Sequence, residues 1–158
     1  MANAPSPLAV GQPAPTFTTT TFDGQTVSLE DYRGQSLALY FYPKDATPGC
    51  TSQACNLRDN LELLHQRGVA VVGVSPDPDA SHEKFSTKHD LPFPLLADPD
   101  HKIIDAYGVW GEKKNYGKTY MGLQRTTFLI DQDGVIIHVF KRPKTKAHAE
   151  EIISKLKN

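Results

Sequence analysis

The stretch that decides the fold is residues 36–55, which read SLALYFYPKDATPGCTSQAC. Residues 36–42 are nearly continuous in apolar and aromatic side chains and end at Pro43, which is typical of a strand covered on both faces. A helical pattern follows from about Pro48 to Gln66, closes at Gly68, and leads into a second apolar run at 69–75. The order strand, helix, strand predicts a β-α-β unit with two parallel strands.

The rest of the chain continues this alternation of strands and helices. Residues 17–29 alternate about an Asp23-Gly24 turn and predict an N-terminal β-hairpin. Further along we expect a helix at 80–89, a strand at 93–97, a short helix at 102–107, a glycine-rich long loop at 110–122, a hairpin at 126–140 and an amphipathic helix at 145–157. The predicted fold class is α/β, a central mixed β-sheet flanked by helices.

Length and charge indicate one domain over residues 1–158, with residues 1–8 as a flexible tail. The 17 basic and 18 acidic residues give a formal net charge of -1, which argues against a nucleic-acid partner or an anionic membrane surface. No apolar run approaches the ~20 residues that span a bilayer, and the start of the chain lacks the features of a signal peptide. We therefore expect a cytoplasmic protein.

Cys50 and Cys55 are the only cysteines in 158 residues. Thr47 is predicted to cap the helix, with Pro48 at its first position and Cys50 at its third, where unpaired N–H groups attract negative charge. In a reducing compartment a close pair of thiols is more often catalytic or metal-binding than structural. The position therefore favours a thiolate at Cys50.

A helix terminus alone is too weak to ionise a thiol at neutral pH. A free thiol has a pKa of about 8.5, and lowering it to about 6 requires roughly 3.4 kcal/mol, whereas a helix terminus supplies ~0.3 to 1 kcal/mol and at most ~2 kcal/mol. A cation must lie nearby, and Arg125 is the candidate. It precedes the predicted strand 126–130, which can pair beside the first strand and present the guanidinium at the same end of the sheet.

The spacing of the two cysteines predicts a conformational change. Residues five apart in a regular helix have Cα atoms about 8.6 Å apart, and a disulfide tolerates at most about 7 Å. If both cysteines lie on the helix, they can bridge only after its first turns unwind. Such a change suits a catalytic cysteine that meets an oxidant first and its resolving partner afterwards.

At these residues the chain resembles the peroxiredoxins, and within them the bacterioferritin comigratory protein or PrxQ subgroup. The resemblance runs from about residue 8 to the end and rests on FYPK at 41–44, TPGCT at 47–51 with Cys55, LRD at 57–59, GVWGEK at 108–113 and RTTFLID at 125–131. The family pattern P-x-x-x-T-x-x-C is met by Pro43, Thr47 and Cys50, and the family's arginine falls on Arg125. Position 53, where relatives often have Glu, is Gln here.

The resemblance implies a thioredoxin-like fold and a monomeric thiol peroxidase that needs no metal and no organic cofactor. Hydrogen peroxide or an organic hydroperoxide would oxidise Cys50 to a sulfenic acid, and Cys55 would resolve it as an intramolecular disulfide that thioredoxin or a similar dithiol donor reduces. Thr47 would hydrogen-bond the sulfur or the peroxide. Arg125 would stabilise developing negative charge, and Pro43 would shield the sulfur from water.

Two other functions fit parts of the sequence. A general thiol-disulfide exchanger normally uses C-x-x-C, whereas four residues separate the cysteines here. A metal-binding or structural module would leave a tetrahedral site half filled, because the six histidines are scattered without metal-ligand spacing. The preferred peroxide and the reductant stay open at this stage.

Overall fold

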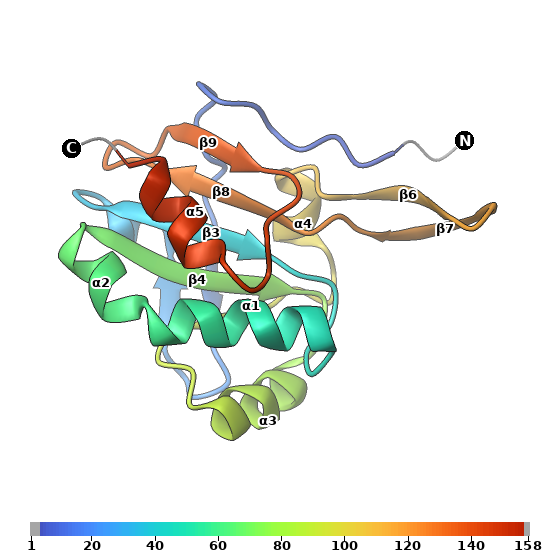
Figure 1. Cartoon of the computed structure of the whole chain (residues 1–158), viewed down its shortest axis with the longest axis horizontal. Helices are drawn as coiled ribbons and strands as arrows, with labels where there is room; N and C mark the ends of the chain where they lie inside the picture. The colour runs from blue at the N-terminus through green and yellow to red at the C-terminus, as the bar shows by residue number, and fades with distance from the viewer. Residues whose placement is uncertain (1–3, 157–158) are drawn as a thin grey trace.

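A five-stranded mixed sheet forms the centre of the molecule (Figure 1). The structure is a computed structural model and describes residues 4–156. Across the sheet the strands are, in order, β5 (Leu95–Ala97), β4 (Val69–Ser75), β3 (Ser36–Phe41), β8 (Thr126–Ile130) and β9 (Ile136–Phe140). Because β3 runs parallel to β4 and antiparallel to β8, the predicted β-α-β unit and the mixed sheet are both confirmed.

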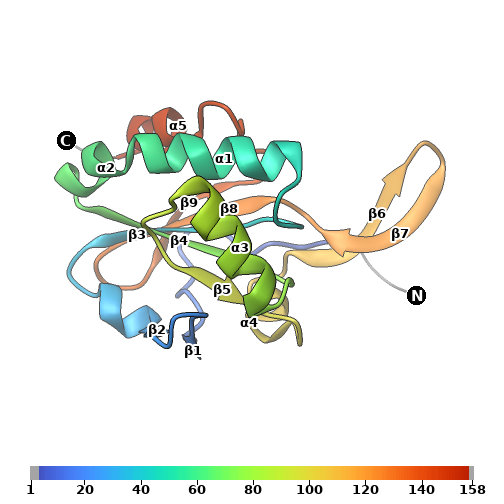
Figure 2. The same ribbon diagram turned by 90° about the horizontal axis from the view of Figure 1, so that it is seen from below.

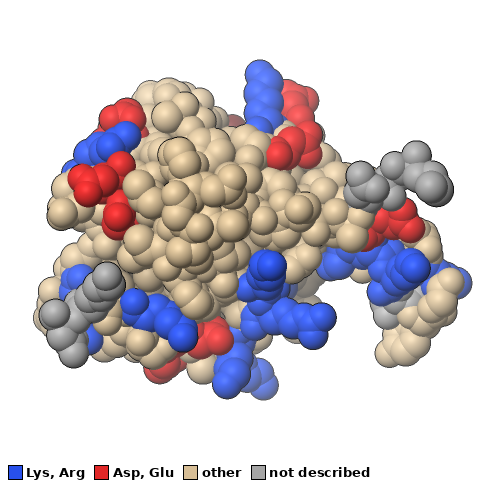
Figure 3. All heavy atoms as spheres, turned by 90° about the horizontal axis from the view of Figure 1, so that it is seen from above, with Lys and Arg blue, Asp and Glu red and all other residues tan. Residues whose placement is uncertain are grey.

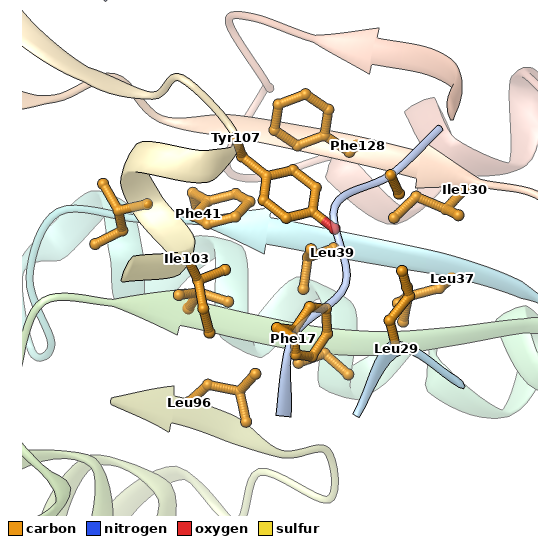
Figure 4. Packing of buried hydrophobic residues seen from close by; sticks show 14 of the residues in the cluster. Phe17, Leu29, Leu37, Leu39, Phe41, Leu96, Ile103, Tyr107, Phe128 and Ile130 are labelled. Atoms are coloured by element: carbon orange, nitrogen blue, oxygen red, sulfur yellow. The ribbon is translucent and has the colours of Figure 1, made fainter. Parts of the chain in front are cut away.

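Both faces of the sheet are covered (Figure 2). One face carries α1 (Pro48–Asp59), α2 (Leu61–Gln66), α3 (Asp79–His89) and α5 (His148–Ser154), and the other carries α4 (Lys102–Ala106), the 3-10 helix η1 (Leu29–Tyr32) and the predicted hairpin of β1 (Thr18–Thr20) and β2 (Thr26–Ser28). Each face of the sheet has its own hydrophobic core, and successive residues of β3 alternate between them. Leu39 and Phe41 belong to the core on the α4 side, and Tyr40 belongs to the core on the α1 side. In the core on the α4 side, Tyr107 and Phe128 pack against Phe41 (Figure 4).

The stretch expected as a long loop is a β-hairpin that extends away from the body (Figure 1). Strand β6 (Trp110–Asn115) pairs antiparallel with β7 (Lys118–Leu123). The turn between them holds Tyr116 and Gly117 at φ of 51° and 78°, the backbone of a two-residue hairpin turn. The sequence gives no strand signal there because most side chains of the hairpin are exposed or half-buried, so neither face needs an apolar pattern.

The helix predicted over 48–66 is divided at Asn60, which has φ of -111° and ψ of 10° and separates α1 from α2. The Asn60 side-chain amide donates to the Asn56 carbonyl at 2.8 Å, a local bond that competes with regular helical geometry. The C-terminal helix is shorter than the predicted 145–157, and residue 157 lies outside the described residues.

The N-terminal segment lies along the body in an extended course. Within the stretch predicted to be a flexible tail, Ser6 N–H donates to the Gly108 carbonyl at 2.9 Å and Leu8 N–H donates to the Tyr107 carbonyl at 3.3 Å. The Tyr107 hydroxyl then donates to the Pro15 carbonyl at 2.7 Å. Contact with the body therefore begins at Ser6, and the segment covers the edge of one core. Within residues 4–156, none of the helices has the length and apolar character needed to cross a bilayer.

Candidate active site

Cys50 lies in the first turn of α1, which follows the central strand β3 through the loop 42–47. Thr47 is the N-cap residue, with φ of -80° and ψ of 155°, and Pro48 is the first residue of the helix. The Cys50 side chain is almost entirely buried, with 1% of the residue exposed. The local sequence therefore places a buried sulfur at a helix N-terminus, where free N–H groups favour negative charge.

Arg125 contacts this sulfur directly. Its Nη2 donates to Cys50 Sγ at 3.2 Å, and its Nη1 donates to Gln53 Oε1 at 2.6 Å. The sheet register explains the placement, because Thr126 at the start of β8 pairs with Phe41 at the end of β3. A Cβ on Gly49 would lie 3.2 Å from Arg125 Nη2, so glycine at this position gives the guanidinium close access to the helix start. The helix terminus and the guanidinium together stabilise an anionic sulfur.

Two further polar side chains lie close to the sulfur or to Arg125. The sequence drew attention to Gln53 without giving it a role, and it did not single out Tyr40. In the described part of the chain, the only buried side-chain nitrogen or oxygen atoms without a hydrogen-bond partner are Gln53 Nε2 and the Tyr40 hydroxyl. Burial raises the pKa of Tyr40 well above its ordinary value, and nearby Cys50 and Asp45 raise it further, so the hydroxyl remains a donor. Gln53 lies one helical turn after Cys50, a spacing that could have indicated it.

A buried network fixes the loop that leads to Cys50. The Asp45 carboxylate accepts hydrogen bonds from the Tyr42 hydroxyl at 2.6 Å, Ser81 Oγ at 2.8 Å and His82 Nδ1 at 2.7 Å. His82 Nε2 lies 3.1 Å from the Leu96 carbonyl, so both ring nitrogens face acceptors. Burial opposes ionisation of Asp45, but the bonds from His82, Tyr42 and Ser81 outweigh it and lower the pKa of this carboxyl. The loop is thereby tied to α3 and β5.

The remaining predicted site residues lie around this centre without direct bonds to the sulfur in the structure. The Thr47 hydroxyl donates to the Lys44 carbonyl at 2.9 Å and makes no capping hydrogen bond. Pro43 is exposed in the loop after β3. Cys55 is half-buried further along α1, and both cysteines are free thiols. Among the residues that the structure describes, no group of three or more His, Cys, Asp or Glu side chains is arranged to hold a metal ion.

A basic hollow of about 390 Å³ lies beside Arg125 and is lined further by Lys113, Gln124, Lys141, Arg142 and Pro143. Figure 3 shows Lys and Arg side chains gathered along one side of this view and on the β6–β7 hairpin, whereas the middle of the face carries little charge. Several cations near Arg125 add to the positive potential at the site. This surface favours anionic sulfur and attracts polar or anionic reactants.

Comparison with known proteins identifies the family. The model of the AhpC/TSA family matches residues 10–139. Peroxiredoxin Bcp of Bacillus subtilis is 47% identical over 151 residues, which cover 96% of each chain. This chain belongs to the peroxiredoxins of the AhpC/TSA family, in the Bcp/PrxQ subgroup. Peroxiredoxin Bcp of Escherichia coli is similar to the same degree, with 48% identity over 96% of this chain and 97% of the relative.

Solved structures of peroxiredoxins confirm the thioredoxin-like fold. One is the bacterioferritin comigratory protein of Xanthomonas campestris, studied for alkyl peroxide reduction activity, with a TM-score of 0.81 and 33% identity over 87% of this chain and 88% of that one. Peroxidoxin BcpB of Mycobacterium tuberculosis superposes with a TM-score of 0.80 and 30% identity over 92% of this chain and 94% of that one. The peroxiredoxin family and thiol peroxidase activity predicted from the sequence are thus confirmed.

Proposed function

We propose that this peroxiredoxin reduces hydrogen peroxide and organic hydroperoxides at Cys50. The observation that carries the proposal is the 3.2 Å contact between Arg125 Nη2 and the buried Cys50 sulfur at the start of α1. The thiolate attacks one peroxide oxygen, the O–O bond breaks, and the other oxygen leaves with a proton as water or an alcohol. Cys50 is then a sulfenic acid. The alkyl peroxide reduction activity of the Xanthomonas campestris relative supports organic substrates.

The neighbouring side chains support this reaction in different ways. Arg125 holds the thiolate and stabilises the charge that develops on the leaving oxygen. Gln53 Nε2 and the Tyr40 hydroxyl are unpaired donors near the sulfur that suit oxygen atoms bound to it. Thr47 becomes a donor to the peroxide when a rotation about χ1 releases its hydroxyl from Lys44, and Pro43 shields the sulfur from water.

We propose that Cys55 resolves the sulfenic acid within the same chain. Its thiolate attacks the Cys50 sulfur, a disulfide forms, and hydroxide leaves and takes up a proton as water. Since α1 is continuous from Pro48 to Asp59, its first turns must unwind during this step. Thioredoxin or a similar dithiol donor then reduces the disulfide. A reducing compartment such as the cytoplasm supplies such donors, and the chain acts as a monomer in this scheme.

Two single substitutions test the assignment of the cysteines. Cys50→Ser abolishes peroxide consumption, because the attacking sulfur is gone. Cys55→Ser still forms a sulfenic acid at Cys50 but accumulates sulfinic and sulfonic acid under excess peroxide, because no resolving thiol is present. Intact-mass spectrometry of alkylated protein follows each species, with the parent chain as control. An unchanged mass at Cys50 in Cys55→Ser after peroxide treatment contradicts the proposal.

A further inference from the structure

The second cysteine has a histidine neighbour that the reaction described above does not use. His89 Nδ1 lies 3.8 Å from Cys55 Sγ, within hydrogen-bond distance for sulfur. The histidine comes from the last turn of α3, which is 34 residues away in sequence and lies beside α1 (Figure 1). Both side chains are half-buried, so the pair is partly shielded from water. The contact joins a thiol to a side chain that accepts protons at physiological pH.

One contact holds the backbone of His89 and another holds its ring. Arg58 Nη1 donates to the His89 carbonyl at 2.7 Å and ties the end of α3 to α1. The ring also packs edge-on against Phe85, with the ring centroids 5.2 Å apart. Since Phe85 is buried, this contact limits the orientations open to the imidazole. Nδ1 is therefore directed at the sulfur by a fixed framework.

The charges around the pair favour transfer of a proton from sulfur to nitrogen. The Arg58 guanidinium lies on the same side of α1 as the contact and stabilises a thiolate at Cys55. The pKa of Arg58 is raised by its hydrogen bond to Asp59 and further by nearby Cys55 and Asp90. His89 lies in the last turn of α3, where the free carbonyls of the helix end attract positive charge. Tyr40 of β3 and Cys50 also lie within electrostatic range, and Tyr40 stays neutral because burial raises its pKa.

We infer that His89 is the general base for Cys55 in disulfide formation, an inference that rests on the proposed function. Nδ1 takes the proton of the Cys55 thiol while α1 is still folded, and the thiolate then moves to the oxidised Cys50 as the first turns unwind. The new S–S bond replaces the S–O bond of the sulfenic acid. Hydroxide leaves and is protonated to water, with the imidazolium or solvent as the proton source. Cys55 is oxidised and the Cys50 sulfenic acid is reduced.

The effect of His89 is largest at neutral pH. An unassisted thiol with a pKa of about 8.5 is only about 3% ionised at pH 7, so a base that ionises it raises the rate by at most about 30-fold. At pH 9.5 such a thiol ionises by itself and the advantage disappears. A histidine that merely held Cys55 in the folded helix has a different signature, because its loss leaves the rate unchanged or increases it at every pH.

The test is rapid-quench alkylation with intact-mass detection after one equivalent of hydrogen peroxide, from pH 6.5 to 9.5. His89→Asn keeps a hydrogen-bonding group near the Nδ1 position but cannot take the proton. We expect disulfide formation to slow by about 10- to 30-fold at pH 7 and by less than about 3-fold at pH 9.5. Sulfenic acid formation, read in the same traces, is unchanged. His65→Asn, which changes an exposed histidine in the last turn of α2, leaves both steps unchanged.

An equal or faster rate in His89→Asn, or the same loss at all pH values, overturns the inference. The pH dependence of disulfide formation in the parent chain is a second test and needs no variant. Its disulfide formation is nearly independent of pH between 7 and 8.5, and a rise of about tenfold per pH unit there contradicts assistance by His89. Failure of the proposed function looks different, because the parent chain itself then forms no disulfide between Cys50 and Cys55.

Discussion

At the scale of the residue, the guanidinium of Arg125 is the contact on which peroxide reduction most depends. Arg125→Ala removes a charged donor 3.2 Å from the Cys50 sulfur, and we expect the second-order rate constant for hydrogen peroxide to fall about 100-fold or more. Arg125→Lys keeps the charge but loses the fork that reaches both Cys50 and Gln53, so its loss is smaller. Stopped-flow mixing of reduced protein with peroxide measures both.

Arg67→Ala is the matched control for the arginine series, because Arg67 is exposed at the end of α2. Its rate constant equals that of the parent chain. A rate constant for Arg125→Ala within threefold of the parent value contradicts the role assigned to Arg125. Far-ultraviolet circular dichroism of the variants verifies that their secondary-structure content equals that of the parent chain.

The sequence predicts those site residues whose chemistry is local or whose place follows from strand pairing. Cys50 could be predicted from the helix start, and Arg125 from the end of the sheet at which its strand begins. His89 could not, because its contact with Cys55 depends on how α3 packs on α1, and no spacing encodes that packing. Two partners of Asp45, Ser81 and His82, were missed for the same reason, since they come from α3 and Asp45 lies in the loop before α1.

At the scale of the element, α1 divides into a part that can open and a part that is anchored. Asn56 Oδ1 accepts from Ala149 N–H at 2.7 Å, and Asn56 Nδ2 donates to the Lys146 carbonyl at 3.1 Å, which fixes α1 to the α5 region. Opening that starts at Pro48 therefore stops before Asn56. The opened part contains both cysteines, which matches the requirement that they approach each other.

We expect the disulfide form to lose amide protection at residues 51–59, because their N–H groups bond carbonyls of residues 47–55 in the part that opens. Protection is kept at Asn60 and Leu64, whose N–H groups donate to the carbonyls of Asn56 and Asn60. Hydrogen exchange followed by mass spectrometry on the reduced and oxidised forms measures this difference, with the buried strand β4 as an internal control. Unchanged exchange at 51–55 rules out local unwinding. Loss of protection at Asn60 and Leu64 as well shows instead that the Asn56 anchor does not hold.

Helix α5 carries a buried histidine that makes stability depend on pH. His148 Nδ1 lies 3.0 Å from Glu151 Oε1 and so carries the hydrogen, while Nε2 accepts from the Thr127 hydroxyl at 2.8 Å. Burial lowers the pKa of His148 despite the opposing effect of Glu151, so the ring is neutral in the folded chain. In the unfolded chain it takes up a proton near pH 6.5. Below that pH the unfolded state binds more protons, and the free energy of unfolding falls.

His148→Gln removes this part of the pH dependence. We expect the loss of unfolding free energy between pH 7.5 and 5.5 to be smaller in His148→Gln than in the parent chain, as measured by urea denaturation. His138, whose pKa burial also lowers, is present in both chains and cancels in the comparison. As a control, His65→Gln changes an exposed histidine, and its unfolding free energy varies with pH as in the parent chain. If His148→Gln and the parent chain lose the same unfolding free energy between pH 7.5 and 5.5, His148 is not the source of this pH dependence.

The helices and strands that could be predicted from the sequence are those with a buried face. Strands β3 and β4 carry apolar runs because both of their faces are covered, and the runs mark their positions closely. The β6–β7 hairpin was missed because its pairing leaves most side chains in solvent, and the break at Asn60 was missed because the apolar pattern continues across it into Leu61 and Leu64. Periodicity reports burial, and it is silent where an element buries little.

At the scale of the whole molecule, the N-terminal segment is part of the fold. Ser6 N–H bonds the Gly108 carbonyl, and a Cβ on Gly108 would collide with the Ser6 carbonyl oxygen. Gly108 also has a φ of 74°, so alanine there costs about 1 kcal/mol in backbone strain alone. In the full chain Gly108→Ala must also displace the segment and its hydrogen bonds, each of which contributes about 1 kcal/mol.

A double-mutant cycle separates these two costs. We expect Gly108→Ala to lower the free energy of unfolding by about 2 to 3 kcal/mol in the full chain, but by only about 1 kcal/mol in a chain that lacks residues 1–7. Gly34→Ala is the matched control, because Gly34 has a φ of 88° and nothing within 4 Å of the added Cβ, so its cost is the same in both chains. Urea denaturation of the six chains supplies the values. Equal costs of Gly108→Ala in the two backgrounds contradict a packed N-terminal segment, since the alanine then meets only backbone strain.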